Sequence, residues 1–306
     1  MTAVPDLVAL GETMLSLVAV DGPIDGAMSF RPTHAGAESN ACVAAVAAGL
    51  RAAWISRLGA DPTGDRILAA LETVGVDVSW VRRDPDRPTG LMLRDTVGGV
   101  RYWRHGSAAS ALEPGDLDGI PVAEARAVLV TGITALLGDG PWRTAVSFLE
   151  RGAGIRVVDP HVRPGLFGSD RAAALVRPLI ERCDVLLGGE EELARLLDTS
   201  DRGESLVRRV QLLGPSEVVL KRGRDGAAAL LPNGKWFEHH PPPVADVDPV
   251  GAGDAFNGTY LAARLKGAEI PEALAAGATS GAAAAGTMGD LANVPTTHGG
   301  AAATDR

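Results

Sequence analysis

The sequence is poor in cysteine and in aromatic residues. Only two cysteines occur among its 306 residues, Cys42 and Cys183, and each lies in or beside an apolar run. That number excludes a disulfide framework and a metal centre built on cysteine, so we expect two buried, reduced thiols. Aromatic residues make up 4% of the chain, which disfavours a site that stacks a nucleobase against aromatic rings.

Long apolar segments and an excess of basic residues are also missing. No run of about 18 uncharged apolar residues occurs, so we expect no membrane-spanning helix. Residues 1–12 contain two acids and no basic residue, unlike a secretory signal. The formal net charge of −9 argues against nucleic acid or an anionic membrane as the main partner. We therefore expect a cytoplasmic protein in which any anionic substrate meets a local cluster of Arg or Lys.

The chain does contain short apolar runs that alternate with longer amphipathic segments. The apolar runs predict strands at residues 6–10, 52–56, 127–131, 155–159, 184–188 and 217–221. The amphipathic segments predict helices that include 38–50, 62–75, 140–152 and 191–198. This α/β alternation favours a mostly parallel sheet covered by helices on both faces. No repeat or linker divides the chain, so we expect residues 1–306 to form one domain with a flexible tail at 297–306.

Two segments, 14–33 and 89–105, depart from that alternation. Both show the period of two that is typical of strands, and Gly98-Gly99 is a hairpin turn signal. Beyond that turn, Tyr102 should share one face with its alternate neighbours while Trp103 points to the other face. The pattern predicts a small antiparallel flap on the large sheet. Edge hairpins without a function are the alternative.

Unusual polar sequences directly follow the predicted strands. Gly11-Glu12 follow the first strand, Asp159 and His161 follow the fourth, and the segments 188–192 and 221–226 follow the last two. The carboxyl ends of parallel strands face the ligand crevice of an open α/β sheet. We therefore expect a site at this edge.

The stretch DPVGAGDAFNG, residues 248–258, leads into a predicted helix at 252–266. The first turn of a helix offers free N–H groups and a partial positive charge. Glycines at 251 and 253 have no side chains, so a phosphate can approach these N–H groups closely. A carboxylate at this place, Asp254, suits a base that takes a proton from a hydroxyl during phosphoryl transfer. A helix-start acid that only complements the dipole is the structural alternative.

Two other phosphate-binding motifs do not match the sequence. The string GAGDAF has Phe256 where a dinucleotide fingerprint needs its third glycine, and it comes late in the chain. No such fingerprint follows the first strand, which disfavours a nucleotide-dependent dehydrogenase. The pattern G-x-x-x-x-G-K-[ST] is also missing, so the chain has no P-loop.

The stretch GAGDAFNG, together with HAGAESNACVAAVAAGL at 34–50, resembles the two signatures of the ribokinase-type (PfkB) carbohydrate kinases. The shorter strings GETM, GAESN, PTGLM, RHGSAAS and TGITALL resemble the 2-keto-3-deoxygluconate kinase branch of that family. The resemblance covers almost the whole chain. It implies a ribokinase-like three-layer α/β/α domain with a small β-stranded lid at about 12–33 and 89–105. It also implies transfer of the γ-phosphate of ATP to a small sugar acid.

The resemblance implies a role for each matching residue. Asp254 matches the catalytic base and Arg163 matches an arginine near substrate and phosphate. The residues that match the anion hole are Gly251, Ala252 and Gly253, and those that match the sugar pocket are Gly36, Asn40, Tyr102, Arg104, Arg163 and Asp254.

Two arginines suit a carboxylate substrate, because it needs paired cations that Arg104 and Arg163 supply. Simpler readings are an exposed hairpin charge for Arg104, a surface ion pair for Arg163 and plain packing of the flap for Tyr102.

The resemblance also implies ATP, Mg²⁺ and a monovalent cation such as K⁺ as cofactors. The nucleotide-binding positions are Lys221, Gly223 and Gly226, together with Gly251 and Gly253. The metal positions are Glu192 for Mg²⁺ and Asp248 for the monovalent cation. A solvated acid at a helix start is the alternative for Glu192.

Several residues depart from the family pattern. His161 replaces an amide, Gly189 replaces an asparagine near the magnesium, Pro249 and Val250 replace hydroxyl residues, and Met92 stands where some relatives have tyrosine. These changes bear on rate and substrate more than on fold. A kinase for a neutral sugar such as fructose or for a nucleoside, and a catalytically weak sugar-acid-binding regulator, therefore stay open. Unpaired strand edges in the lid favour a homo-oligomer.

Overall fold

The structure is a computed structural model that describes residues 4–162, 169–241 and 248–286. The predictions made for Arg163 and for the tail at 297–306 lie outside these residues. Within the described part of the chain, no helix is both long and apolar enough to span a bilayer.

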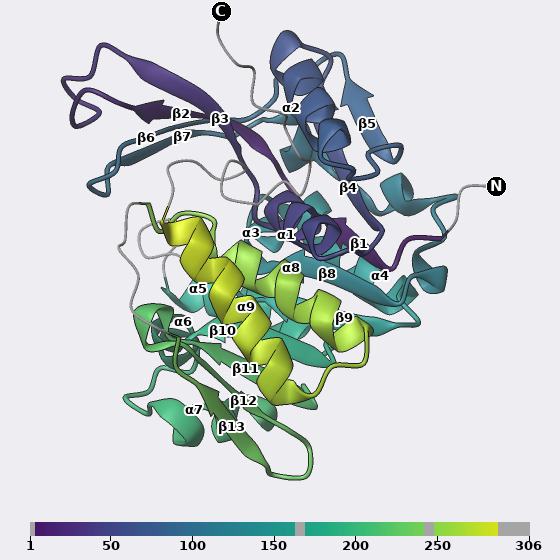
Figure 1. Ribbon diagram of the computed structural model, residues 1–306. Coiled ribbons are helices and arrows are strands. Elements are labelled where there is room, and N and C mark those ends of the chain that lie inside the picture. Colours follow the sequence, from purple (N-terminus) through teal and green to yellow (C-terminus); the bar gives the residue numbers. More distant parts are fainter. Residues whose placement is uncertain (1–3, 163–168, 242–247, 287–306) are drawn as a thin grey trace, which may run out of the picture.

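A nine-stranded sheet forms the centre of the described chain, in the order β13-β12-β11-β10-β9-β8-β1-β4-β5 (Figure 1). Its parallel strands are β1 (Leu7–Leu10), β4 (Ala52–Gly59), β5 (Val81–Asp84), β8 (Ala127–Thr131), β9 (Ile155–Asp159), β10 (Val185–Gly189) and β11 (Glu217–Lys221). The antiparallel edge consists of β12 (Ala227–Leu230) and β13 (Trp236–His239). All six predicted strands are present, so the prediction of a mostly parallel sheet is confirmed.

Helices cover both faces of this sheet and bury a separate apolar core on each. One layer contains α1 (Ala37–Ala47), α2 (Pro62–Thr73), α8 (Ala252–Leu265) and α9 (Ile270–Ala285). The other contains α3 (Gly132–Ala135), α4 (Asp139–Arg151), α5 (Ser169–Ile180), α6 (Glu190–Leu196) and α7 (Gly203–Gln211). Short 3₁₀ turns lie at Ala108–Ala111, Pro114–Leu117, Val122–Glu124 and Gly223–Asp225. Cys42 and Cys183 are buried free thiols in the two cores, as predicted.

A second, four-stranded sheet projects from the carboxyl edge of the large one, and we call it the lid (Figure 1). Its order is β3-β2-β6-β7, with β2 at Met14–Ala19, β3 at Phe30–Ala35, β6 at Leu91–Arg94 and β7 at Val100–Trp103. The prediction of a purely antiparallel flap is wrong, because β2 and β6 pair in parallel. Both strands continue outward from parallel strands of the main sheet, β1 and β5, so they run in the same direction.

The two faces of the lid differ as the alternation predicted. Met92 lies opposite Tyr102 in the pairing of β6 with β7, and both pack with Met14 and Ala35 on the inner face. Trp103 points outward and is 56% exposed. Met28 and Val97, in the connecting loops, are also exposed.

The helices α1 and α8 approach each other closely at Gly258. A Cβ atom added at Gly258 would lie 2.1 Å from the carbonyl oxygen of Ala41 and 2.8 Å from the Cβ of Ala44. Only a residue without a side chain fits this crossing. The crossing brings the start of α1, from the first sixth of the chain, against the start of α8.

We expect Gly258→Ala to lower the free energy of unfolding by about 1–3 kcal/mol, because the added methyl group forces the two helices apart. The melting temperature, followed by circular dichroism, measures this change. Gly26→Ala is the matched control, since nothing lies within 4 Å of a Cβ added at Gly26. Equal melting temperatures for the two variants would show that the helix crossing tolerates a side chain.

Candidate active site

The site lies where the order of the parallel strands reverses. From β1 the chain passes through α1 to β4 on one side, whereas β8, on the other side of β1, begins the series that continues to β11. The carboxyl ends of β1 and β8 therefore form a topological switch point, the usual place for a ligand crevice in such sheets. The polar sequences that follow β1, β9, β10 and β11 all lie at this edge, as predicted, because these strands are parallel.

A buried acid that sequence reasoning missed, Glu38, fixes the switch point. Its Oε1 accepts hydrogen bonds from the N–H of Thr131 at 3.1 Å and from the hydroxyls of Thr131 and Thr134 at 2.7 Å. Burial raises the pKa of Glu38, although these hydrogen bonds oppose the change. A Cβ at Gly11 would lie 2.1 Å from the Glu38 carboxyl carbon. Glu38 thus ties α1 to the ends of β1 and β8.

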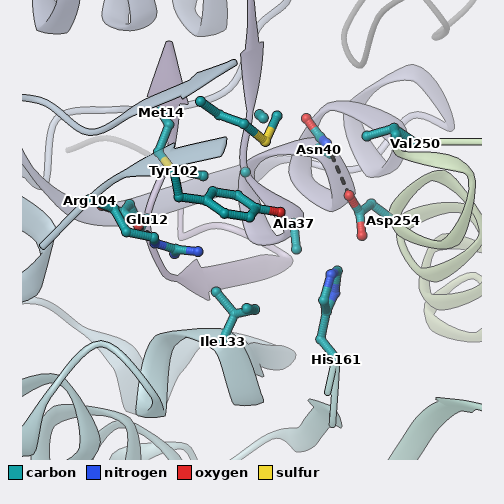
Figure 2. Close-up of a pocket in the computed structure, with 13 residues that line it drawn as sticks. Glu12, Met14, Ala37, Asn40, Tyr102, Arg104, Ile133, His161, Val250 and Asp254 are labelled. Atoms are coloured by element: carbon teal, nitrogen blue, oxygen red, sulfur yellow. Dashed lines mark hydrogen bonds and ion pairs between the residues drawn. The ribbon is translucent and has the colours of Figure 1, made fainter. Parts of the chain in front are cut away.

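A pocket opens between the inner face of the lid and the first turns of α1 and α8 (Figure 2). It contains about 460 Å³ of empty space, part of it open to solvent. The predicted residues Gly36, Asn40, Tyr102, Arg104 and Asp254 all line it. A Cβ at Gly36 would lie 2.3 Å from the Thr13 hydroxyl, so glycine is needed there for close packing.

Asp254 lies in the first turn of α8, and 6% of its surface is exposed. The amide group of Asn40 donates a hydrogen bond to its Oδ2 at 3.0 Å, which orients the carboxylate (Figure 2). Gly251 caps the helix with a φ of +83°, a left-handed conformation that favours glycine.

The residues predicted to form an anion hole, Gly251, Ala252 and Gly253, lie at the start of α8. The N–H of Ala252 donates to the carbonyl of Pro249 at 3.3 Å. The N–H groups of Gly253 and Asp254 follow in the first turn of α8. A phosphate oxygen would meet these two donors and the positive end of the dipole.

A buried charge network lies beside this turn. Lys221, at the end of β11, donates to Asp159 at 2.7 Å and to Asn257 at 3.2 Å, and Asn257 donates to Asp159 at 2.7 Å. Burial alone would raise the pKa of Asp159, but the charges of Lys221 and His161 and the hydrogen bonds hold it below its ordinary value. Burial alone would lower the pKa of Lys221, but the charges of Asp159 and Glu192 raise it. Both groups are therefore ionised at neutral pH.

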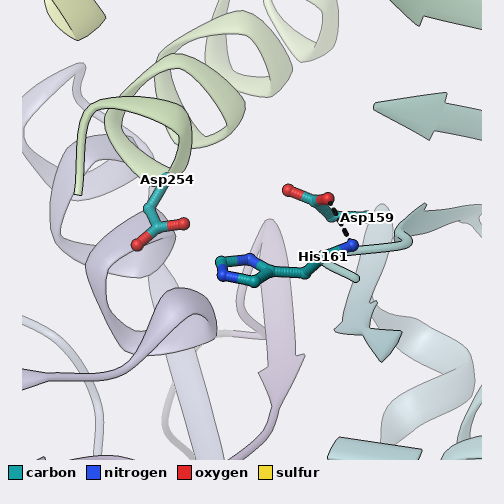
Figure 3. A group of neighbouring side chains, drawn as sticks. All are labelled: Asp159, His161 and Asp254. Atoms are coloured by element: carbon teal, nitrogen blue, oxygen red, sulfur yellow. Dashed lines mark hydrogen bonds between the residues drawn. The ribbon is translucent and has the colours of Figure 1, made fainter. Parts of the chain in front are cut away.

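His161 extends from the end of β9 toward Asp254 (Figure 3). Its φ of +44° is unusual for a residue other than glycine, and such strained conformations cluster at functional sites. Ligand atoms of Asp159, His161 and Asp254 lie within 4.8 Å of one another, a spacing that fits a metal ion. Asp159 already holds the ammonium group of Lys221, which disfavours a divalent cation against the same carboxylate.

Arg104 is a pocket residue and not an exposed hairpin charge. Its side chain is 14% exposed and forms an ion pair with Glu12, a residue that is 2% exposed. The hydroxyl of Ser107 donates to Glu12 at 2.6 Å, and the guanidinium lies 5.7 Å from the centre of the Tyr102 ring. The motif Gly11-Glu12 signalled this acid, but its partner could not be predicted from local sequence.

Comparison with known proteins agrees with this geometry. The family model for the pfkB family carbohydrate kinases matches residues 4–297. The chain belongs to the pfkB family of carbohydrate kinases.

The relatives of this PfkB kinase are similar over nearly their whole length. A 2-dehydro-3-deoxygluconokinase of Thermoproteus tenax is 37% identical over 96% of this chain and 92% of its own. A 2-dehydro-3-deoxygalactonokinase of Haloferax volcanii is 33% identical over 94% and 93%. The crystal structure of a PfkB protein from Polaromonas sp. JS666 superposes with a TM-score of 0.85, at 32% identity over 94% of this chain and 98% of that chain. The predicted family and the ribokinase-like α/β fold are thereby confirmed.

The remaining predicted positions lie in the turn after β11, in the first turn of α6 and in the segment before α8. Gly223 and Gly226 form the turn between β11 and β12 with φ values of +57° and +94°, and a Cβ at Gly226 would lie 2.0 Å from the carbonyl of His239. Glu192 accepts a hydrogen bond from the N–H of Gly189 at 3.0 Å and so caps α6. Asp248 is buried and forms an ion pair with Arg94 of the lid.

We expect Lys221→Met to lower the free energy of unfolding by about 3–5 kcal/mol at neutral pH, because Asp159 stays buried without its cation. Because folding lowers the pKa of Asp159, its carboxylate stabilises the folded protein at pH values above the ordinary pKa of 3.8. This stabilisation is lost as the pH falls through the folded-state pKa. The difference between the two proteins should therefore shrink at acidic pH. Urea unfolding at a series of pH values measures it.

Lys235→Met is the control for this variant, because Lys235 is exposed. A Lys221→Met protein as stable as the control at neutral pH would contradict the role of the Lys221–Asp159 pair.

Proposed function

We propose that this PfkB kinase transfers the γ-phosphate of ATP to a hydroxyl group of a small keto-deoxy sugar acid, most simply 2-keto-3-deoxygluconate. The observation that carries the proposal is the carboxylate of Asp254, oriented by Asn40 at the first turn of α8 and facing a pocket that also contains Arg104. Relatives named for 2-dehydro-3-deoxy sugar acid kinases support this substrate class.

In the proposed mechanism, Asp254 accepts the proton of the attacking hydroxyl while the first-turn amides of α8 stabilise the charge on the transferring phosphoryl group. Phosphoryl transfer requires mainly positioning and charge stabilisation, and both are provided here by one short segment. The hydrogen bond from Asn40 holds one carboxylate oxygen, so the approach of the hydroxyl is directional. Arg163 is proposed as a further clamp on the phosphates.

The carboxylate of the sugar acid is proposed to bind Arg104. A guanidinium group has five N–H donors, so Arg104 is able to keep its ion pair with Glu12 and still donate to the substrate. The ring of Tyr102 covers the same part of the pocket. Because Glu12 balances the charge of Arg104, a neutral sugar such as fructose is the second candidate substrate.

The nucleotide is proposed to lie beyond the anion hole, against Lys221 and the turn that contains Gly223 and Gly226. A Cβ added at Gly253 would lie 3.5 Å from the Nζ atom of Lys221, which puts this ammonium group beside the proposed phosphate site. The Mg²⁺ that accompanies ATP would neutralise phosphate charge. Glu192 would hold it, since Mg²⁺ is usually bound by one or two carboxylates and by substrate phosphates. The negative charge of Glu192 contributes to the raised pKa of Lys221.

The lid is proposed to close over the sugar and exclude water, which limits wasteful hydrolysis of ATP. Its inner face carries the apolar side chains Met14 and Met92, which line the pocket above the sugar site.

Asp254→Asn should reduce kcat by roughly 10²–10⁴-fold with little change in the KM for the sugar, because the proton acceptor is lost. Asparagine keeps an oxygen that accepts the hydrogen bond from Asn40, so we expect the fold to survive. Sugar-dependent release of ADP in a coupled assay measures the rate. Asp25→Asn, an exposed change in the lid loop, is the control.

Undiminished phosphorylation by Asp254→Asn would end the proposed mechanism. A wild-type protein that is thermally stabilised by sugar acids but releases no ADP with any sugar would instead be a binding regulator.

Arg104→Met should raise the KM for a keto-deoxy sugar acid by about 10–100-fold, as expected for the loss of a hydrogen bond to a charged group. The KM for a neutral sugar should change much less. A panel of sugar acids and neutral sugars in the ADP-release assay measures both. Arg101→Met is the matched control, because Arg101 is exposed on the outer face of β7. Equal turnover of acids and neutral sugars by the wild-type protein would refute the role given to Arg104.

A further inference from the structure

A buried ion pair joins the lid to the loop that precedes the anion hole. Arg94, the last residue of β6, places its Nη1 atom 2.8 Å from Oδ2 of Asp248, and each side chain is 1% exposed. In the alternation of β6, Arg94 shares the inner face of the lid with Met92, which lines the sugar pocket. The pair therefore spans the site from the lid to the segment that leads into α8.

The backbone around Asp248 is itself fixed. Its N–H donates to the carbonyl of Ala285 at 3.0 Å, and its Oδ1 accepts from the N–H of Val250 at 3.2 Å. Three residues after Asp248 comes Gly251, the cap of α8, so this fixed carboxylate lies close in the chain to the start of the proposed anion hole.

Asp248 matches a family position that ligates a monovalent cation, and its surroundings among the described residues do not fit such an ion. A K⁺ ion beside Asp248 would need a carboxylate oxygen as an inner ligand. Arg94 already places a full positive charge against that oxygen, in a buried site where repulsion between two cations is much stronger than in water. The guanidinium group is covalently attached and does not exchange with ions in solution.

We propose that the guanidinium group of Arg94 takes the place of a monovalent cation beside Asp248, so that phosphoryl transfer by this kinase does not require K⁺. This inference rests on the proposed function, since it concerns the same site. Arg94 is a positioning residue: it neutralises Asp248 and thereby holds the 248–251 segment in the conformation that starts the anion hole. Arg94 belongs to β6, so its guanidinium group is part of the lid and moves with the lid.

The first experiment uses the wild-type protein in KCl, NaCl or tetramethylammonium chloride at equal ionic strength. With ATP, Mg²⁺ and the best acceptor of the sugar panel, kcat and the KM for ATP should be the same in all three salts. The melting temperature, with and without ADP, should also show no shift that is specific to K⁺. A several-fold rise of kcat in KCl, or a K⁺-specific stabilisation, would overturn the proposal.

The melting temperature also separates this inference from the proposed function. If no sugar is phosphorylated, the proposed function fails, while the response of the ADP-bound protein to K⁺ still decides whether Arg94 replaces the ion.

A second experiment changes Arg94 itself. Arg94→Met should lower kcat by roughly 10–100-fold through misplacement of the anion hole, with a much smaller change in the KM for the sugar. Arg94→Lys should restore most of the rate, because it returns a tethered cation. Arg101→Met is the control within the same lid. Full activity of Arg94→Met in tetramethylammonium chloride would refute the positioning role, as would failure of Arg94→Lys to improve on Arg94→Met. If Arg94→Met does not fold, the wild-type salt series and Arg94→Lys still test the proposal.

Discussion

The close crossing of α1 and α8 is the contact on which the site depends. It allows the amide of Asn40 to reach the carboxylate of Asp254. The crossing is possible because Gly258 has no side chain where the backbone of α1 passes. On the other side, Glu38 in the same helix α1 accepts hydrogen bonds from Thr131 at the end of β8 and from Thr134 in α3. One short helix thus positions both the proposed base and the switch point of the sheet.

The electrostatics of the pocket follow a repeated arrangement. Three cations at the site each face one buried acid: Lys221 with Asp159, Arg104 with Glu12 and Arg94 with Asp248. Each positive group is balanced by its own acid, which limits the repulsion among the three cations. An arriving phosphate or carboxylate then meets oriented donors. Donors that are oriented before the ligand arrives are the condition for effective charge stabilisation in the proposed reaction.

The main architecture could be predicted because local patterns of apolar and polar residues indicate it. Apolar runs predicted six of the seven parallel strands of the described chain, and the glycines before Asp254 predicted the start of α8. The strand β12 was missed because its sequence, AAAL, has almost no preference for extended structure. The parallel pairing of β2 with β6 and the partners of Glu12 and Asp248 were also missed. These contacts join segments far apart in the chain, and nothing in the sequence near either partner specifies the other.

The order in which the chain is made has a consequence for the hydrogen bond between Asn40 and Asp254, whose positions differ by 214 residues. The parallel strands and the lid all precede α8, so most of the molecule is synthesised before the base exists. A growing polypeptide on the ribosome, or a product that stops before this helix, therefore contains Asn40 and the lid without the proposed base. Incomplete copies of the protein cannot consume ATP in the proposed way, however well their sheet has formed.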